Sequence, residues 1–458
     1  MGQQRTEKRA RDYPLRFTLV GAATCLLIAL TACGATLGEN ALGLSEHPAA
    51  RVDKLKATTP APYERLGQTV AIGANFIVAG GFGSAAPGSQ GGVVRLFPRE
   101  GGDWGDSVSI SPAEAADASF GHAVASGGSR VVASAPLEGG GGARTGTVFV
   151  FEPGDGGWQP TATLTPEEPG SAERFGTSLA IDGGRLAVGA PGAEAQAVYV
   201  YSSSETGWEL EAKLAAGAGG SPGFGSAVAI DGDRLAVASP SDAEGGRGEV
   251  RLFRRSESGW QPEQTLTAPE AGLMFASALA LDGDSLLVGA PAVQSAPSVF
   301  AYRWDGTDWR QEDRLFSTDP GPGHFGSALA LDGNVLAVGA PGSSPEEDGS
   351  VGSVHVYERT DESWQHRAGL VVSGLRSTDA FGAAVAVKGG LVLAGATGDS
   401  DLAEISGALY LFYLPDLGAG FERSAEGGVE HAVGQGLALG GKNGATHGVA
   451  VGASPAER

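Results

Sequence analysis

The residues closest to a catalytic motif are Gly219-Gly220-Ser221-Pro222-Gly223, which formally match the G-x-S-x-G nucleophile elbow. In that motif a strained turn between a strand and a helix exposes the serine hydroxyl for acyl transfer. Here both flanks have the pattern of a turn and a strand, and proline follows the serine. We therefore interpret the match as a chance one and expect no nucleophile at Ser221.

The histidines do not form a motif for metal binding or acid–base catalysis. His122 and His355 lie in short apolar runs and are expected to be half-buried strand residues. The sequence has no H-E-x-x-H, no C-x-x-C pair and no Walker A motif, because "GGKNGAT" lacks both the spacing and a Ser or Thr after Lys442. We expect no catalytic residues and no cofactor, although a site assembled from distant segments would leave no linear motif.

Repetition dominates the rest of the sequence. The segment "FGSALALDGNVLAVGAP" from Phe325 has similar copies along the chain. Counting a diverged first copy that begins with Leu66, seven copies start near residues 66, 120, 175, 224, 275, 325 and 381. A period of about 50 residues is typical of an array, solenoid or propeller rather than of one globular core.

Each copy has the pattern of a β-hairpin. Ala328, Leu329, Ala330 and Leu331 alternate with period two, which places alanines on one face of a strand and leucines on the other. Because both faces are apolar, we expect the large side chains of one sheet to pack over the alanines of the next. Asp332-Gly333 then predicts a tight hairpin turn, so this aspartate is interpreted as a turn residue.

Two more strands complete the repeat. A Val-x-Val-Tyr type run such as "GSVHVY" from Gly352 predicts the third strand, and a Trp such as Trp364 begins the fourth. Four antiparallel strands per repeat predict an all-β fold, a seven-bladed β-propeller of four-stranded blades. "RVDKLKATTP" from Arg51 resembles the end of a fourth strand, so we expect the N-terminal segment to supply the outer strand of the last blade.

Phe-Gly at the start of each unit and Gly-Ala-Pro after the second strand resemble the FG-GAP repeats of integrin α subunits and of many bacterial surface proteins. The resemblance covers residues 51–415 and implies the same seven-bladed propeller. "VGQGLALGGKNGATHGVAVGASP", within a Gly/Ala-rich tail of residues 416–458, looks like the first half of another unit. Eight blades with an incomplete last blade are therefore the alternative.

The resemblance also implies a place to look for calcium. Integrin-type repeats carry a loop of the form D-x-D-x-D-G-x-x-D after Gly-Ala-Pro, whose carboxylates supply the oxygen ligands that calcium prefers. No loop of this chain completes that pattern. Asp399, Asp401 and Glu404 come closest and form a weak calcium candidate, with a solvated acidic loop as the alternative.

The N-terminus indicates export. A basic segment precedes an apolar run that is too short to span a membrane and is typical of a signal peptide. Leu30-Thr31-Ala32-Cys33 resembles the bacterial lipoprotein lipobox, which implies cleavage after residue 32 and lipidation of Cys33. Residues 1–32 are then a signal peptide and residues 33–50 a lipidated flexible tether. An ordinary secretory signal with a chance cysteine is the alternative.

Composition limits the partners. The net charge of −22, without a basic stripe, argues against nucleic acid, since neutralising phosphates needs clustered Lys and Arg. We expect a monomeric, membrane-anchored envelope lipoprotein that binds a protein or glycan through the dissimilar loops after each second strand. Gly34, in place of Asp, favours the outer membrane. A hydrolase or lyase of envelope polysaccharide with a site at the propeller axis, or a purely structural lipoprotein, are the alternatives.

Overall fold

The computed structural model describes residues 51–82, 92–112, 119–137, 145–166, 173–192, 196–217, 221–240, 246–291, 296–318, 323–342, 351–361, 363–414, 417, 430–431, 433–438, 446–449 and 452–453. Cys33, the segment of residues 1–50 and the rest of the tail lie outside these ranges. Within them, no helix is both long and apolar enough to cross a membrane.

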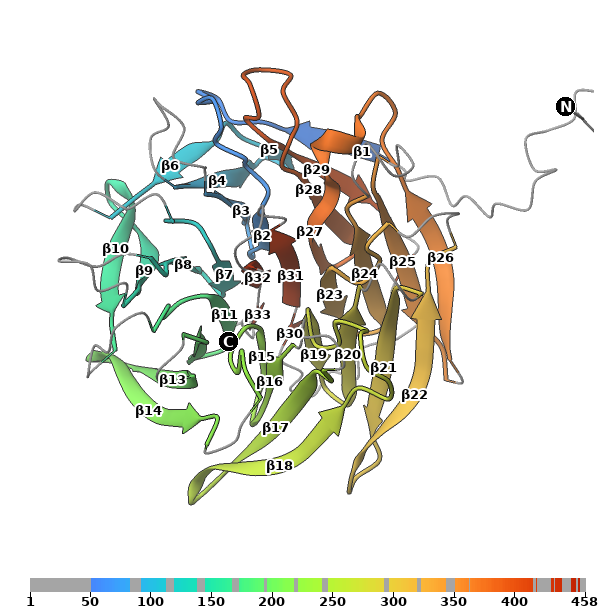
Figure 1. Ribbon diagram of the computed structural model, residues 1–458. Helices are drawn as coiled ribbons and strands as arrows, with labels where there is room; N and C mark the ends of the chain where they lie inside the picture. The colour runs from blue at the N-terminus through green and yellow to red at the C-terminus, as the bar shows by residue number, and fades with distance from the viewer. Residues whose placement is uncertain are drawn as a thin grey trace, which may run out of the picture. The chain divides into compact units, whose positions relative to one another are not determined.

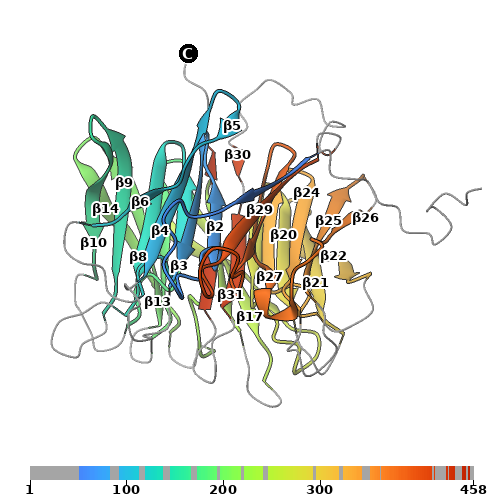
Figure 2. The same cartoon turned by 90° about the horizontal axis from the view of Figure 1, so that it is seen from above.

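Seven antiparallel sheets form the blades of a ring (Figure 1). Within a blade the strands follow one another in chain order, and they run between two faces, where the connections gather (Figure 2). The predicted all-β seven-bladed propeller is therefore confirmed.

The strands of the first four blades are the following. Blade 1 holds β2 (Thr69–Ile72), β3 (Phe76–Gly81) and β4 (Val93–Glu100), with β5 (Asp103–Trp104) and β6 (Val108–Ile110) both paired to β4. Blade 2 holds β7 (Val124–Gly127), β8 (Arg130–Ala135), β9 (Thr147–Gly154) and β10 (Gly157–Leu164). Blade 3 holds β11 (Ser178–Asp182), β12 (Arg185–Ala190), β13 (Ala197–Ser204) and β14 (Gly207–Ala215). Blade 4 holds β15 (Val228–Asp231), β16 (Arg234–Ser239), β17 (Glu249–Ser256) and β18 (Gly259–Thr267).

Three blades complete the ring. Blade 5 holds β19 (Leu279–Asp282), β20 (Ser285–Ala290), β21 (Ser298–Trp304) and β22 (Trp309–Phe316). Blade 6 holds β23 (Ala328–Asp332), β24 (Val335–Ala340), β25 (Ser353–Arg359) and β26 (Trp364–Leu370). A short 3-10 turn, η3 (Ser377–Asp379), leads into blade 7, which holds β27 (Phe381–Lys388), β28 (Leu391–Ala396), β29 (Ala408–Tyr413) and, from the other end of the chain, β1 (Arg51–Leu55).

The N-terminal segment closes the ring as expected. β1 pairs antiparallel with β29, in a register that sets Arg51 opposite Tyr413 and Leu55 opposite Leu409. Because β1 is the outer strand of a blade whose other strands are the last of the ring, the two ends of the propeller are joined by a hydrogen-bonded ladder. The pairing covers the outer edge of β29 and makes β1 the edge strand of blade 7.

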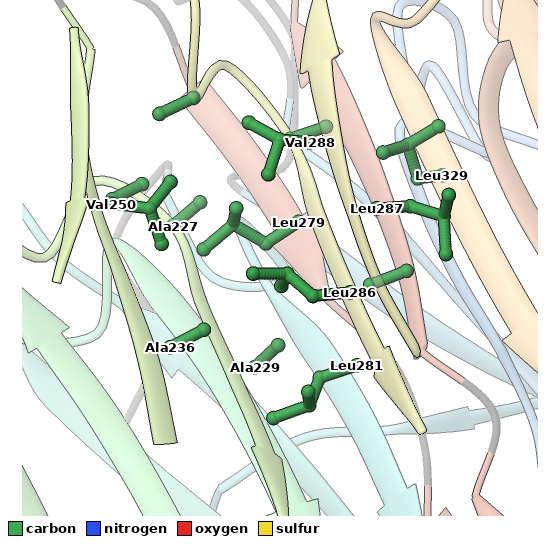
Figure 3. Packing of buried hydrophobic residues seen from close by; sticks show 14 of the residues in the cluster. Ala227, Ala229, Ala236, Val250, Leu279, Leu281, Leu286, Leu287, Val288 and Leu329 are labelled. Atoms are coloured by element: carbon green, nitrogen blue, oxygen red, sulfur yellow. The ribbon is translucent and has the colours of Figure 1, made fainter. Parts of the chain in front are cut away.

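The large and small faces of the inner strands pack as the alternation predicts. Leu329 and Leu331 lie in the core shared with blade 5, whereas Ala328 and Ala330 lie in the core shared with blade 7. Figure 3 shows the same arrangement one boundary earlier, where Leu279, Leu281 and Leu286 of blade 5 face Ala227, Ala229 and Ala236 of blade 4. Each boundary between blades is thus a layer of leucines and valines over alanines.

The Asp-Gly turns do more than reverse the chain. The Oδ2 atom of Asp332 accepts a hydrogen bond at 2.7 Å from the backbone N–H of Gly389, in the corresponding turn of blade 7. Equivalent bonds join Asp182 to Gly232, Asp231 to Gly283 and Asp282 to Gly333. The aspartates are turn residues, as interpreted, and they also link blades 3 to 7 along one face.

Glycines bring the backbones of neighbouring blades together. At five boundaries a glycine near the end of the second strand, at the place of the Gly in Gly-Ala-Pro, abuts the carbonyl of the second residue of the next unit. An added Cβ would lie 1.9–2.2 Å from that oxygen. The pairs are Gly80 with Gly121, Gly189 with Gly225, Gly289 with Gly326, Gly339 with Gly382 and Gly395 with Gly67. A side chain at one of these five positions would force the two backbones to shift, although Ser134 and Ala238 take the equivalent place in blades 2 and 4.

A second set of glycines makes a similar contact at five boundaries, including the two that the first set lacks. The glycine before the third strand abuts the carbonyl of the residue that opens the next unit, and an added Cβ would lie 1.8–2.3 Å from that oxygen. The pairs are Gly92 with Phe120, Gly146 with Phe175, Gly248 with Phe275, Gly352 with Phe381 and Gly407 with Leu66. Every one of the seven boundaries, including the closing one, therefore has at least one such contact.

The described strands of the tail do not build an eighth blade. β31 (Val433–Ala438) and β32 (Thr446–Val449) pair as a hairpin, which is the first half of a repeat, and β31 also pairs with the inner strand β23. β33 (Gly452–Ala453) pairs with β30 (Glu430–His431) and makes one parallel bridge to β7. The described strands of the tail thus add to the inner edges of blades 2 and 6, so the prediction of seven blades is confirmed over the eight-blade alternative.

Candidate functional site

Two of the predicted calcium residues lie together in the connection between β28 and β29. The side chain of Asp399 is only 4% exposed and that of Asp401 is 57% exposed. The Oδ1 atom of Asp399 accepts the backbone N–H of Asp401 at 3.1 Å, and the hydroxyl of Ser400 donates to the carbonyl of Gly398 at 3.0 Å. The loop is therefore folded tightly around the two aspartates.

Glu404 is held elsewhere. Its backbone carbonyl accepts the N–H of Tyr63 at 2.7 Å, and a hydrogen bond with its carboxylate raises the pKa of the Tyr63 hydroxyl. Across the described parts of the chain, no three His, Cys, Asp or Glu side chains are grouped to hold a metal ion. The structure brings Asp399 and Asp401 together without Glu404, and calcium binding stays a prediction.

A lysine ammonium lies where the two aspartates meet. Lys54 Nζ, on the closing strand β1, donates to Asp399 Oδ2 at 2.5 Å and to Asp401 Oδ2 at 2.6 Å. It also lies 5.1 Å from the centre of the Tyr410 ring, and the Tyr410 hydroxyl donates to Asp399 Oδ2 at 3.0 Å. Lys56 adds a bond to Asp401 at 3.0 Å. Residues about 345 positions apart in the sequence thus form one ion cluster at the closing blade.

This cluster shifts the pKa of its members. Hydrogen bonds from Lys54 and then Lys56 lower the pKa of Asp401 to about 2. Burial opposes the charge of Lys54, but its bonds to Asp399 and Asp401 outweigh burial and raise its pKa. Burial also raises the pKa of Tyr410 to about 12. Lys54 and Asp401 therefore stay charged, and Tyr410 stays a hydroxyl donor, throughout the neutral range.

A hollow of about 300 Å³ opens beside the cluster. We call it the seam hollow; it is lined by Lys54, Ser373, Gly374, Leu375, Arg376, Asp379, Asp399, Ser400, Asp401 and Tyr410. Asp379 is buried, and both its oxygens are held by Arg376, through the side chain at 2.9 Å and the backbone N–H at 2.8 Å. The lining offers hydrogen-bond donors and acceptors of both charges, which can recognise a polar group.

Asp379 belongs to a pattern that the sequence reading missed. An acidic residue stands two positions before the Phe or Leu that opens the first, third and seventh units, at Glu64, Glu173 and Asp379, and all three are buried. Glu64 pairs with Arg95 at 2.7 Å, and Glu173 accepts the Tyr199 hydroxyl at 3.2 Å. The shared offset from the repeat start is the signal that could have identified these acids.

The other residues weighed as chemical candidates have structural places. Ser221 lies in a turn that leads into the strand β15, so no nucleophile elbow forms. The buried His355 ring contacts Phe325 edge-on at 5.2 Å, and its Nε2 is 3.1 Å from the Ser353 hydroxyl. His122, also buried, stacks on Phe82 at 4.6 Å. Both histidines are more deeply buried than the half-buried residues that were expected, and His122 lies just before β7 and not in a strand.

The lowered pKa of Asp401 predicts a dependence of stability on pH. The carboxylate titrates near 3.8 when unfolded and near 2 when folded, so its stabilisation is complete above about pH 4 and is lost as the pH falls towards 2. Because the side chain is largely exposed, the effect should be below about 1 kcal/mol. In urea unfolding at pH 6, 4 and 2, Asp401→Asn should lose less stability on acidification than wild type. Parallel pH profiles for the two proteins would contradict this.

Comparisons with known proteins support the repeat. The FG-GAP repeat model matches residues 158–201, 309–357 and 364–412. No curated protein matches the chain. Among solved structures, the RRP9 WD40 repeats have a TM-score of 0.48 at 11% identity and cover 80% of this chain and 98% of theirs.

Two bacterial structures are similarly distant. A protein from Lactobacillus plantarum has a TM-score of 0.43 at 14% identity, covering 68% of this chain and 86% of its own. A putative 6-phosphogluconolactonase from Bacteroides uniformis has a TM-score of 0.44 at 12% identity, covering 66% and 84%. These likenesses are too weak to bear on function. The FG-GAP repeat model matches three segments of the chain, and the described strands form a ring of seven blades, so the chain carries FG-GAP repeats within a β-propeller.

Proposed function

We propose that the protein is a lipid-anchored binding scaffold of a bacterial envelope, whose propeller presents one face to a protein or glycan. The observation that carries the proposal is the seam hollow, whose polar lining comes from the connection before β27, the connection between β28 and β29, and the ends of strands nearby. Fold alone does not imply function, so the proposal depends on this site.

The strands maintain the fold, and the loops are proposed to bind the partner. The repeated residues fill the boundaries between blades, and the connections after each second strand are unlike one another in length and sequence. In blade 7 this connection also carries Leu402, which is 52% exposed, and the neighbouring connection begins at Val371, which is 61% exposed. Exposed apolar residues next to a polar hollow suit the recognition of a partner, because they gain by leaving water.

The anchor is proposed from the lipobox-like Leu30-Thr31-Ala32-Cys33. Two or three acyl chains on residue 33 hold a protein stably on a membrane, whereas a single chain is marginal. The segment of residues 34–50 would separate the ring from that membrane, with outer-membrane placement favoured by Gly34.

Lipidation can be tested on the two cysteines of the chain. The full chain expressed in a Gram-negative host should incorporate labelled palmitate and sediment with membranes. Cys33→Ser should lose both, because the thiol that takes the lipid is gone, while Cys25→Ser, a matched change inside the leader, should keep both. Labelling that survives Cys33→Ser, or is absent from the wild type, would rule out the anchor.

The binding face can be tested by site-specific photocrosslinking in cells. A benzophenone amino acid placed at Leu402 should give an adduct of discrete mass, or a glycan ladder, because this position is exposed beside the seam hollow. The matched control is the exposed Thr206, between β13 and β14. Turns between third and fourth strands lie on the opposite face, since antiparallel connections alternate between the two ends of a blade. Equal adducts at both positions, or none at Leu402, would contradict the proposal.

A further inference from the structure

The tail contains half of a repeat unit, and the ring has no boundary that is open to it. β31 and β32 pair antiparallel in chain order, as the first two strands of each blade do. All seven boundaries between blades are already closed by glycine contacts. Because a two-stranded hairpin is at best marginally stable alone in water, this hairpin depends on another sheet edge.

The inner strand of blade 6 supplies that edge. β31 pairs antiparallel with β23, in a register that sets Val433 opposite Leu331 and Gln435 opposite Leu329. The sheet of blade 6 thereby grows to six strands. β31 also lies beside the inner strands β2, β19 and β27, and Figure 1 shows β30 to β33 at the centre of the ring. The described strands of the tail therefore lie at the axis of the propeller, among the inner strands.

The order of the strands brings the chain directly to this edge. Tyr413 ends β29 opposite Leu391, the residue that begins β28 after its turn. Val433 begins β31 opposite Leu331, just before the Asp332-Gly333 turn. β29 therefore ends, and β31 begins, at the face of the ring that carries the turns between first and second strands. Residues 414–432 separate the two strands, and a chain of this length reaches up to about 60 Å when extended.

The composition of the tail suits a place between sheets, and this is independent of the pairing. The chain has 53 Asp and Glu residues, but residues 431–453 contain none of them, and Lys442 is their one Lys or Arg. Since a charge is costly to bury, a segment without acids is expected where other strands surround it. Gly434 and Gly436 make β31 narrow, as is common where another backbone approaches a strand closely.

We propose that the inner edge of β23 is a strand-acceptor site, which the tail occupies in cis and which binds an extended, uncharged peptide in trans when β31 is displaced. Strand addition gains its affinity from main-chain hydrogen bonds, so a segment of another protein can replace β31 if it is extended and narrow. A flexible tether holds the tail at an effective concentration on the order of 1 mM, so a weaker peptide does not displace it. The tail is thus an autoinhibitory strand. The proposal is independent of the seam hollow and of the proposed binding face.

Hydrogen–deuterium exchange of the full chain tests the pairing in cis. The double variant Gly434→Pro with Gln435→Pro removes two backbone N–H groups from β31 and should break its ladder with β23. Exchange of the β23 amides that face β31 should then rise at least about tenfold. Exchange in β16, a central strand of blade 4, should stay as in wild type. The matched control is Ala419→Pro with Gly420→Pro, outside the described strands, which should leave β23 unchanged.

A synthetic peptide of residues 430–453 tests the acceptor in trans. Labelled with a fluorophore, the peptide should bind the Gly434→Pro, Gln435→Pro variant, which raises its fluorescence anisotropy, and should restore slow exchange in β23. Wild type should bind it at least about tenfold more weakly, because its own tail fills the site. The same peptide carrying Gly434→Pro and Gln435→Pro is the control and should not bind either protein.

Each part of the proposal can fail separately from the proposed binding face. Unchanged exchange of β23 in the double variant, or an equal rise in β16, would overturn occupation by the tail. A peptide that does not bind the double variant, or that binds wild type equally well, would overturn the acceptor site. If the double variant is recovered unfolded, refolding it with the peptide decides the question, with native circular dichroism supporting the proposal and its absence overturning it.

Discussion

The propeller depends on how closely the backbones of neighbouring blades approach one another. At each of the seven boundaries a glycine abuts a backbone carbonyl of the next blade, leaving no room for a Cβ atom. This approach lets the leucine face of one inner strand reach the alanine face of the next, as between Leu329 and blade 5. Since an interior packs at nearly crystalline density, a wider spacing would leave voids along every boundary. The glycines of Phe-Gly and Gly-Ala-Pro thus allow this close approach where they occur, while Ala276, Ser134 and Ala238 take the equivalent places in blades 5, 2 and 4.

The same close approach of backbones occurs where the first and last blades of the propeller meet. Gly395 abuts the carbonyl of Gly67 as the internal glycines abut theirs, and β1 completes blade 7 as the outer strand. Polar contacts then secure the joint, with Lys54 bound to Asp399 and Asp401, and the Trp104 indole donating to the Tyr413 hydroxyl at 2.9 Å. The ion cluster and the seam hollow therefore lie in blade 7, the blade to which both ends of the propeller contribute strands.

The sequence predicted the features of the fold that depend on local residue patterns. Alternation, the Asp-Gly turns and the spacing of the units predicted the hairpins, the number of blades and the origin of the closing strand. It could not predict which distant groups meet, because that depends on the register of β1 against β29: Lys54 faces Tyr410 only in the register observed. The Asp-Gly motif of one turn also could not predict that the Asp332 carboxylate accepts a hydrogen bond from the backbone N–H of Gly389 in the next blade. The sequence shows Glu64, Glu173 and Asp379 at the same position, two residues before the start of a unit. Their burial depends on tertiary packing and could not be predicted from that position.

The role of the glycine contacts can be measured directly with one pair of substitutions. An alanine at Gly339 would place its Cβ 2.2 Å from the carbonyl oxygen of Gly382, whereas an alanine at Gly369, also within a strand of blade 6, would meet no atom within 4 Å. In urea unfolding, Gly339→Ala should lose about 2–4 kcal/mol and Gly369→Ala less than about 0.5 kcal/mol. Equal stabilities for the two variants would contradict the claim that the ring depends on the close approach of backbones between neighbouring blades.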